Sequence, residues 1–272
     1  MPYQKSLSYT RELDTKDSLS YLRDEFHIPS DDQGNEWIYF TGNSLGLQPK
    51  ITQQYIQQEL DDWARFGVEG HFEARNPWLF YHEFLTNSMA KIVGAKPIEV
   101  VVMNTLTTNL HLLMVSFYQP TAKKYKILIE SDAFPSDRYA VQSQLAFHGY
   151  DPKQGLIEWR PRQGEELLRM EDLEQILEEE GDEIALLLIG GVNYYTGQFL
   201  DLKRIAVMGH KKGSIVGIDL AHGAGNIQPN LHESQVDFAA WCTYKYLNAG
   251  PGSLSGIFVH EKHANKKELP RF

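Results

Sequence analysis

The feature that most constrains the fold is a set of three short apolar runs towards the end of the chain. They cover residues 214–220, 237–242 and 254–259, and glycine, asparagine or proline residues bound them. Runs of this length between turn-forming residues are typical of buried strands in an α/β sheet. Asp219 lies at the end of the first run, and Lys245 follows the second. The pattern therefore predicts strands that present a carboxylate and an amine at the edge of a sheet.

Strand-like and helix-like segments alternate through much of the chain. Further strand-like runs cover residues 99–103, 125–130, 157–160 and 184–189. The segments expected to be helical cover residues 18–26, 51–63, 78–93, 106–117, 165–180 and 201–212, with another helix starting near residue 137. This alternation predicts an α/β fold, with a mostly parallel central sheet and helices on both of its faces.

The overall charge and the cysteine content exclude several classes of protein. A formal charge of −10 over 272 residues argues against a nucleic-acid binder, because such proteins carry dense lysine and arginine surfaces. Cys242 is the only cysteine, so the chain holds no internal disulfide, and it has no HExxH or CxxC metal motif. The N-terminal residues lack an apolar targeting segment, and no uncharged apolar stretch reaches 18 residues. We therefore expect a cytoplasmic protein that binds neither membranes nor metals.

The pair Asp219 and Lys245 suits one cofactor, pyridoxal phosphate. This cofactor needs a lysine to bind its aldehyde and an acid to keep its pyridine nitrogen protonated. Each residue alone also has an ordinary explanation, since aspartate often caps a helix and lysine is usually solvated. With Tyr244 beside the lysine and a glycine-rich loop after it, the pair predicts a pyridoxal-phosphate site.

Other side chains lie where the predicted strands end, and ligands of such sheets collect at those ends. Thr107 and Thr108 stand near a predicted helix start, where free N–H groups favour a phosphate, although threonine there also serves as an ordinary cap. Phe134 is placed either to stack on a flat ring or to join the core. His222 is placed to hydrogen-bond Asp219, to lie near the ring, or to fill a structural role. The remaining candidates at these ends are Asp137, Tyr195 and Thr196.

Residues 42–46 match the G-x-S-x-G pattern of a nucleophile elbow. An elbow needs a strand before the serine and a helix directly after it. Pro49 favours a helix start several residues too late for that geometry. The chain also has neither a GxGxxG nor a P-loop motif. The sequence therefore does not favour a serine hydrolase, a dinucleotide site or a nucleoside-triphosphate site.

Six blocks of sequence, taken together, resemble one known family. They are YFTGNSLGLQPK, NTLTTNLHLLMVSFY, ESDAFPSDRYA, GVNYYTGQ, GIDLAHGAGN and CTYKYLNAGPGS, in that order from residue 39 to about residue 260. On these blocks the chain resembles the kynureninases, which are fold-type-I pyridoxal-phosphate hydrolases. The resemblance implies hydrolysis of the Cβ–Cγ bond of L-kynurenine or 3-hydroxykynurenine, to anthranilate or 3-hydroxyanthranilate and L-alanine. It also implies a place in tryptophan catabolism and NAD biosynthesis, and a homodimer.

The resemblance also implies roles for the residues that match the family's motifs. Lys245 would bind the cofactor covalently, Asp219 would pair with the pyridinium, and Lys245 and Tyr244 would shuttle protons. The other implied contacts are Leu106 and Thr107 at the phosphate, Phe134 on the ring, Asp137, His222 and Tyr244 around it, and Ser44 and His71 on the substrate side.

The family pattern further implies how the chain is divided. Residues 1–45 would form an N-terminal arm and a substrate-side loop, and residues 46–272 the large cofactor-binding domain. Family members continue into a small C-terminal domain that this chain lacks, so we expect a fragment of a longer protein. Gly190 and Gly191 stand where relatives can carry a hydroxyl residue, which implies one polar cofactor contact fewer.

Two alternatives remain open on the sequence. The same scaffold serves aminotransferases and cysteine desulfurases, but a desulfurase needs a mobile catalytic cysteine, whereas Cys242 lies inside an apolar run. The chain could also be a cofactor-binding fragment without activity.

Overall fold

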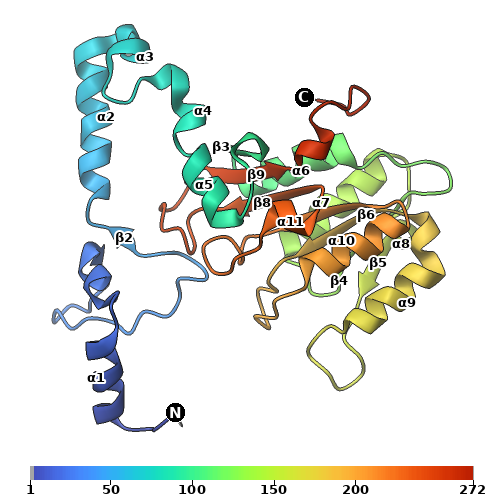
Figure 1. Ribbon diagram of the computed structural model, residues 1–272, viewed down its shortest axis with the longest axis horizontal. Helices are drawn as coiled ribbons and strands as arrows, with labels where there is room; N and C mark the ends of the chain where they lie inside the picture. Colours follow the sequence, from blue (N-terminus) through green and yellow to red (C-terminus); the bar gives the residue numbers. More distant parts are fainter. Residues whose placement is uncertain (1–2, 272) are drawn as a thin grey trace.

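A seven-stranded sheet forms the centre of the computed structural model, which describes residues 3–271 (Figure 1). Its strands lie in the order β3-β9-β8-β7-β6-β4-β5. They are β3 (Val100–Met103), β4 (Lys126–Glu130), β5 (Leu156–Trp159), β6 (Ile184–Gly190), β7 (Ile215–Asp219), β8 (Phe238–Cys242) and β9 (Ser255–Val259). β9 pairs antiparallel with β3 and β8, and all other neighbours pair in parallel. The predicted mostly parallel sheet is confirmed.

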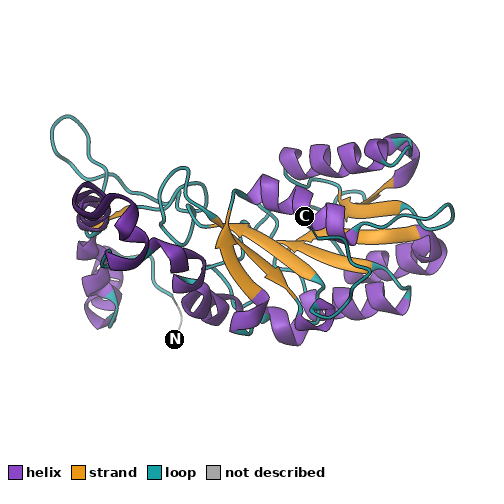
Figure 2. Ribbon diagram, turned by 90° about the horizontal axis from the view of Figure 1, so that it is seen from above, coloured by secondary structure: helices purple, strands orange, loops and turns teal. Residues whose placement is uncertain are grey.

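Helices cover both faces of the sheet, as predicted (Figure 2). Helices α6 and α7 supply the core on one face, and α5, α9, α10 and α11 supply it on the other. The helices are α1 (Leu7–Lys16), α2 (Thr52–Phe66), α3 (Gly70–Glu73), α4 (Tyr81–Phe84), α5 (Thr86–Val93), α6 (Leu106–Phe117), α7 (Pro135–Phe147), α8 (Pro152–Gly155), α9 (Met170–Glu180), α10 (Leu202–Lys211) and α11 (Leu231–Ser234). Short 3₁₀ turns lie at Ser20–Glu25, Gly67–Glu69, Trp78–Phe80, Pro97–Glu99, Gly181–Glu183 and Glu261–His263.

The central strands are apolar because they are buried on both faces. All five residues of β8 are buried, and neighbouring side chains point to opposite sides of the sheet. Phe238 and Ala240 join the core under α6 and α7, while Ala239 and Trp241 join the opposite core. Continuous apolar runs of this kind are what parallel strands covered by helices require.

A buried aspartate fixes β7 against its surroundings at the end of the sheet where this strand begins. Asp237 Oδ2 accepts the N–H of Val216 at 2.7 Å and lies 2.8 Å from His210 Nε2. Its other oxygen lies 2.8 Å from His263 Nε2 and 2.9 Å from Lys262 Nζ. Burial opposes ionisation, but these hydrogen bonds together hold the pKa of Asp237 well below its usual range. The carboxylate therefore ties β7, α10 and the segment after β9 together.

The N-terminal part of the chain stands apart from the sheet (Figure 1). It contains α1, the strand pair β1 (Phe26–His27) and β2 (Gln48–Pro49), α2 and α3. The helix expected around residues 18–26 is present as a 3₁₀ helix at Ser20–Glu25, whereas the α-helix before it, at Leu7–Lys16, was not predicted; the Ser6 hydroxyl caps that α-helix, and none of its residues is buried. The helix expected at 78–93 is broken into a 3₁₀ turn, α4 and α5, and the one expected at 165–180 begins only at Met170. The division at residue 45 stays a prediction, and α2 lies with the arm rather than on the sheet.

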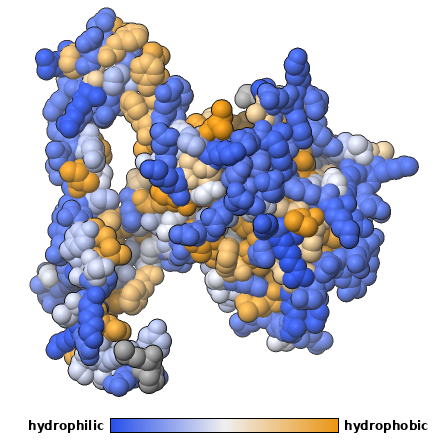
Figure 3. Space-filling view, in the orientation of Figure 1, coloured by the Kyte–Doolittle hydropathy of each residue, from blue (hydrophilic) through white to orange (hydrophobic). Residues whose placement is uncertain are grey.

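Apolar side chains remain exposed on this N-terminal part (Figure 3). Helix α2 buries no residue, although Ile56, Leu60 and Trp63 lie at helical spacing on one side of it. Ile38 and Phe40, in the preceding segment, are also exposed. No helix within residues 3–271 is both long enough and apolar enough to cross a membrane.

The contact between β7 and β8 should tolerate no side chain at Gly217. A Cβ there would lie 2.1 Å from Cζ of Phe238, whose register partner is Gly217. We expect Gly217→Ala to lower the free energy of unfolding by about 2 kcal/mol, because the buried ring has no room to move. Gly42→Ala is the matched control, since a Cβ at Gly42 would meet no atom within 4 Å. Urea denaturation measures both, and equal stabilities of the two variants would contradict this packing.

Candidate active site

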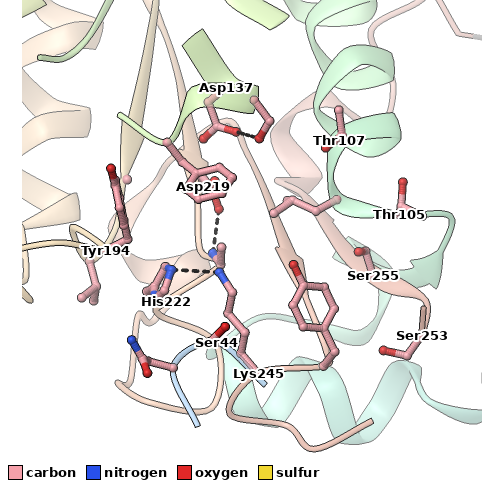
Figure 4. A pocket seen from close by; sticks show the side chains of 18 of the residues that line it. Ser44, Thr105, Thr107, Asp137, Tyr194, Asp219, His222, Lys245, Ser253 and Ser255 are labelled. Atoms are coloured by element: carbon pink, nitrogen blue, oxygen red, sulfur yellow. Dashed lines mark hydrogen bonds between the residues drawn. The ribbon is translucent and has the colours of Figure 1, made fainter. Parts of the chain in front are cut away.

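A cavity of about 590 Å³ opens at the sheet edge where the parallel strands end (Figure 4). Open α/β sheets bind their ligands at this edge, because the connecting loops diverge there. Its walls come from the ends of β4, β6 and β7, the segment after β8, and the starts of α6 and α7. The predicted residues that line it are Ser44, Leu106, Thr107, Phe134, Asp137, Asp219, His222, Tyr244 and Lys245.

Two adjacent parallel strands bring Asp219 and Lys245 to the same cavity. Asp219 ends β7, is 8% exposed, and accepts the N–H of Ala221 at 2.6 Å through Oδ1. Lys245 follows β8, and its Nζ lies 2.8 Å from Nε2 of His222 (Figure 4). His222 reaches the lysine from the turn after β7. The structure therefore places a carboxylate, an imidazole and an amine together.

Burial changes the acid–base behaviour of the two aromatic neighbours of Lys245. Burial, followed by the positive charge of Lys245, lowers the pKa of His222, and nearby Asp219 only partly opposes this. In the tautomer that carries its proton on Nδ1, the neutral imidazole has a lone pair on Nε2 and accepts a hydrogen bond from Nζ of Lys245. Burial also raises the pKa of Tyr244 to about 12, so its hydroxyl keeps its proton at neutral pH.

The N-terminus of α6 forms one end of the cavity. Thr105 is the cap residue, and its hydroxyl accepts the N–H of Thr108. Leu106 and Thr107 occupy the first turn and line the cavity together with Thr105. The remaining N–H groups of a first turn have no partner within their helix and attract anions. The lining residues Ser253 and Ser255 lie at the same end (Figure 4).

The start of α7 supplies an aromatic ring and a buried acid. Phe134 precedes the helix and meets Tyr194 edge-on, with ring centres 5.4 Å apart. Asp137 lies in the first turn and is 7% exposed. Burial and the nearby Asp219 together raise the pKa of Asp137 far above its usual value. Close to Asp219, the carboxyl group of Asp137 therefore keeps its proton at neutral pH.

A third buried acid of the cavity, Glu130, is not among the residues proposed from the sequence. It ends β4, lines the cavity, and accepts the N–H of Gly190 with both oxygens, at 3.1 and 3.0 Å. Burial raises its pKa to about 7. Because Glu130 belongs to an apolar run, it was counted as part of the strand. The rule that found Asp219, a polar residue ending a strand, would also have found Glu130.

A contact between distant parts of the sequence brings Ser44 to the cavity. The N–H of Gly46 donates to the carbonyl of Tyr244 at 2.8 Å. A Cβ at Gly46 would lie 2.2 Å from the carbonyl oxygen of Lys245, so only glycine allows this approach. Asn43 and Ser44 consequently border the cavity next to the lysine.

Four residues proposed from the sequence do not line this cavity: His71, Thr108, Tyr195 and Thr196. His71 lies on α3 in the N-terminal part, where its Nδ1 is 2.8 Å from the carbonyl of Val68. Tyr195 and Thr196 line a second, smaller cavity instead. Their neighbour Tyr194 lines the main cavity instead.

Away from the cavity, Glu99, His232 and His260 place one ligand-type atom each within 4.8 Å of one another. Glu99 Oε1 lies 2.9 Å from Nδ1 of His232 and also accepts the N–H of Glu261. Its Oε2 accepts the N–H of Lys96. These bonds connect α11 and the segment after β9 to the start of β3, which is a packing role. The expectation that the chain binds no metal stays a prediction.

Comparison with protein families and curated proteins gives consistent matches. Residues 38–268 match the family model described as Aminotransferase class-V. A protein named Kynureninase from Myxococcus xanthus is 57% identical over 99% of this chain, which spans 63% of that relative. Relatives with the same name from Flavobacterium psychrophilum and Mus musculus are 56% and 49% identical, over 100% and 93% of this chain. The chain spans 64% and 57% of their lengths.

Solved structures share the fold at low sequence identity. A cysteine desulfurase from Escherichia coli matches with a TM-score of 0.72 at 17% identity, covering 90% of this chain and 59% of that chain. The apo cysteine desulfurase from Thermococcus onnurineus NA1 matches with a TM-score of 0.67 at 18% identity, covering 97% of this chain and 59% of that chain. At such identities these likenesses concern the fold alone.

The contact between Lys245 and His222 can be tested by NMR titration. Removing the positive charge with Lys245→Met should raise the pKa of His222, because that charge is the second largest cause of its low value. Lys245→Arg keeps a positive charge and serves as the matched control, so His222 should remain neutral to lower pH in it. An equally low pKa of His222 in both variants would contradict the arrangement.

Proposed function

The chain belongs to the aminotransferase class-V family, and from that premise we propose that it is a pyridoxal-phosphate enzyme acting on L-kynurenine. It would hydrolyse the Cβ–Cγ bond to give anthranilate and L-alanine, a step of tryptophan catabolism, with the 3-hydroxy form as a second substrate. Relatives named Kynureninase, up to 57% identical, support this activity. The observation that carries the proposal is that the Lys245 amine and the Asp219 carboxylate line one cavity whose end is a helix N-terminus.

The chemistry of the lining residues fits pyridoxal phosphate. Lys245 offers a primary amine to an aldehyde, and Asp219 offers a carboxylate to a ring nitrogen. The first turn of α6, with the hydroxyl of Thr107, offers donors to a phosphate. Asp219 also stands beside two further buried acids, Glu130 and Asp137, so a protonated ring would supply the cation that this wall lacks.

When bound, the cofactor supplies a protonated ring that withdraws negative charge from the α-carbon of the substrate. Nζ of Lys245 would accept the proton from the α-carbon of the substrate and then donate it to a neighbouring carbon atom. The contact with His222 keeps Nζ directed into the cavity, since the neutral imidazole accepts its hydrogen bond. Tyr244 would donate and recover a hydroxyl proton, which its raised pKa keeps in place at neutral pH.

The overall reaction adds one water molecule across the bond that breaks. The hydroxyl of water joins the carbonyl carbon, which leaves as the carboxyl group of anthranilate, and a proton joins Cβ to form alanine. Ser44, held at the rim by the Gly46–Tyr244 hydrogen bond, would contact the substrate. Its roles and those of the other named residues rest on the motif resemblance and on their position in this cavity.

The desulfurase alternative finds no support in the position of the cysteine. Cys242 is 2% exposed within β8, and its Sγ lies 3.8 Å from the carbonyl of Ala221. Burial raises the pKa of its thiol, which disfavours the thiolate that a desulfurase needs. An aminotransferase or an inactive cofactor-binding fragment would leave the cavity as it is, so the assay below must separate these possibilities.

An absorption spectrum with pyridoxal phosphate, followed by L-kynurenine, tests the proposed activity. We expect the visible band of lysine-bound cofactor, and then the fluorescence of anthranilate as substrate is consumed. Lys245→Ala should lose the band and lower turnover by at least about 10³-fold, because it removes both the covalent bond and the proton acceptor. Lys211→Ala, on the surface of α10, is the control. A visible band with pyruvate or transamination products, or with no product, would contradict the assigned reaction.

We also propose that two copies of the chain associate through the N-terminal part. Helix α2 carries an exposed apolar side formed by Ile56, Leu60 and Trp63 and buries none of its own residues. An amphipathic helix without a partner exposes apolar surface that association would remove from water. His71 lies on α3 and does not line the cavity of its own chain. In a dimer it would face the cavity of the second copy.

Light scattering coupled to size-exclusion chromatography tests this association. We expect a dimer for the wild type and a monomer for the double variant Leu60→Glu/Trp63→Glu, because two charges would have to be buried. Gln54→Glu lies on the opposite side of α2 and should remain dimeric. A monomeric wild type, or a dimer in all three proteins, would show that this side of α2 is not the interface.

A further inference from the structure

Glu130 stands between the main cavity and a second, smaller one. It is 5% exposed, and it is one of the residues that line both cavities. The second cavity, about 20 Å³, is large enough for one water molecule. It is otherwise bordered by Ser131, Asp132, Pro161, Glu166, Leu168, Asn193, Tyr195, Thr196 and Gln198.

The backbone of β6 is shaped to hold this carboxyl group. The N–H of Gly190 donates to both oxygens of Glu130. A Cβ at Gly190 would lie 2.4 Å from Oε1, so any other residue there would displace the carboxyl group. Gly190 also pairs with Asp219 across the β6–β7 ladder, so the end of β6 lies between the strand ends that carry Glu130 and Asp219. The sequence predicted that Gly190 would lack a hydroxyl contact with the cofactor. In this chain the carboxyl group of Glu130 occupies the space that a side chain at position 190 would need.

The charges that face Glu130 are mostly negative. Asp219 of β7 and Asp137 of α7 border the main cavity, and Asp132 and Glu166 border the second one. The basic groups that line these two cavities are Lys245 and His222, which are in contact with each other. Ionised Glu130 would therefore add a negative charge directly beside Asp219, and protonated Glu130 would not.

We propose that Glu130 is a positioning residue, whose protonation sets the net charge of the carboxyl cluster that it forms with Asp137 and Asp219. The inference rests on the proposed function, because the cluster matters only if Asp219 faces the cofactor's ring nitrogen. Ionisation of Glu130 strengthens the attraction of the cluster for a protonated ring. Its protonation weakens that attraction, so the affinity of the cavity for the protonated ring changes with pH near neutrality.

A Glu130→Gln variant isolates this effect, because glutamine keeps the shape and the accepting oxygen but resembles only the protonated acid. Burial raises the pKa of Glu130 to about 7 from its ordinary value of 4.5. Between these two values the folded protein holds a proton that the unfolded chain has released. The stability contributed by this group is therefore complete below pH 4.5 and is lost as the pH rises through about 7.

The first experiment measures the thermal midpoint of the cofactor-free protein between pH 5 and pH 8.5. Relative to the wild type, Glu130→Gln should gain about 5 °C on going from the lower to the higher pH, since it pays no ionisation penalty. Glu178→Gln removes an exposed glutamate of α9 and should show no such trend. A difference that is independent of pH would overturn the inference, whether or not the protein binds the cofactor.

The second experiment measures the dissociation constant of pyridoxal phosphate by absorbance at pH 6 and pH 8. At pH 6 Glu130→Gln should match the wild type within about twofold, and at pH 8 it should bind about fivefold more weakly. Equal ratios at the two pH values would overturn the inference. Failure of the wild type to bind pyridoxal phosphate would instead overturn the proposed function, and the thermal experiment would still decide the charge state of Glu130.

Discussion

The position of β7 between two buried parallel strands is the constraint on which the cavity depends. Asp237 accepts the N–H of Val216 near the start of β7, and the ring of Phe238 fills the space above Gly217. These contacts leave one register for the strand, so Asp219 must emerge beside the end of β8, from which the chain reaches Lys245. The distance between Asp219 and Lys245 thus depends on packing near the start of β7, away from the cavity.

The electrostatics of the cavity follow from this geometry. The ends of β4 and β7, which flank β6, and the first turn of α7 place Glu130, Asp219 and Asp137 at one cavity, away from bulk water. Burial and mutual repulsion raise the pKa values of Glu130 and Asp137. Elsewhere in the same cavity, burial and then the charge of Lys245 lower the pKa of His222. The cavity therefore has an acidic wall that favours a cationic ring and a single amine directed towards it.

Much of this arrangement could be predicted from local sequence, because strands and helices have short-range signatures. The apolar runs and their turn residues predicted the mostly parallel sheet, and the strand-end rule predicted Asp219 and its neighbours. The polar helix at Leu7–Lys16 could not be predicted in this way, since it has no apolar side and depends on its cap. The break between α4 and α5 also lacks a proline or glycine signal.

The sequence by itself determined the fold class, the lysine and the acid, because periodicity and spacing encode which strands exist and what ends them. Only the tertiary structure decided which distant segments meet. It brought Ser44 to Lys245 through the close approach at Gly46, left His71 on the N-terminal part, and matched Glu130 to the bare backbone of Gly190. Such contacts depend on sub-ångström fit between segments far apart in the chain, and no local pattern records that fit.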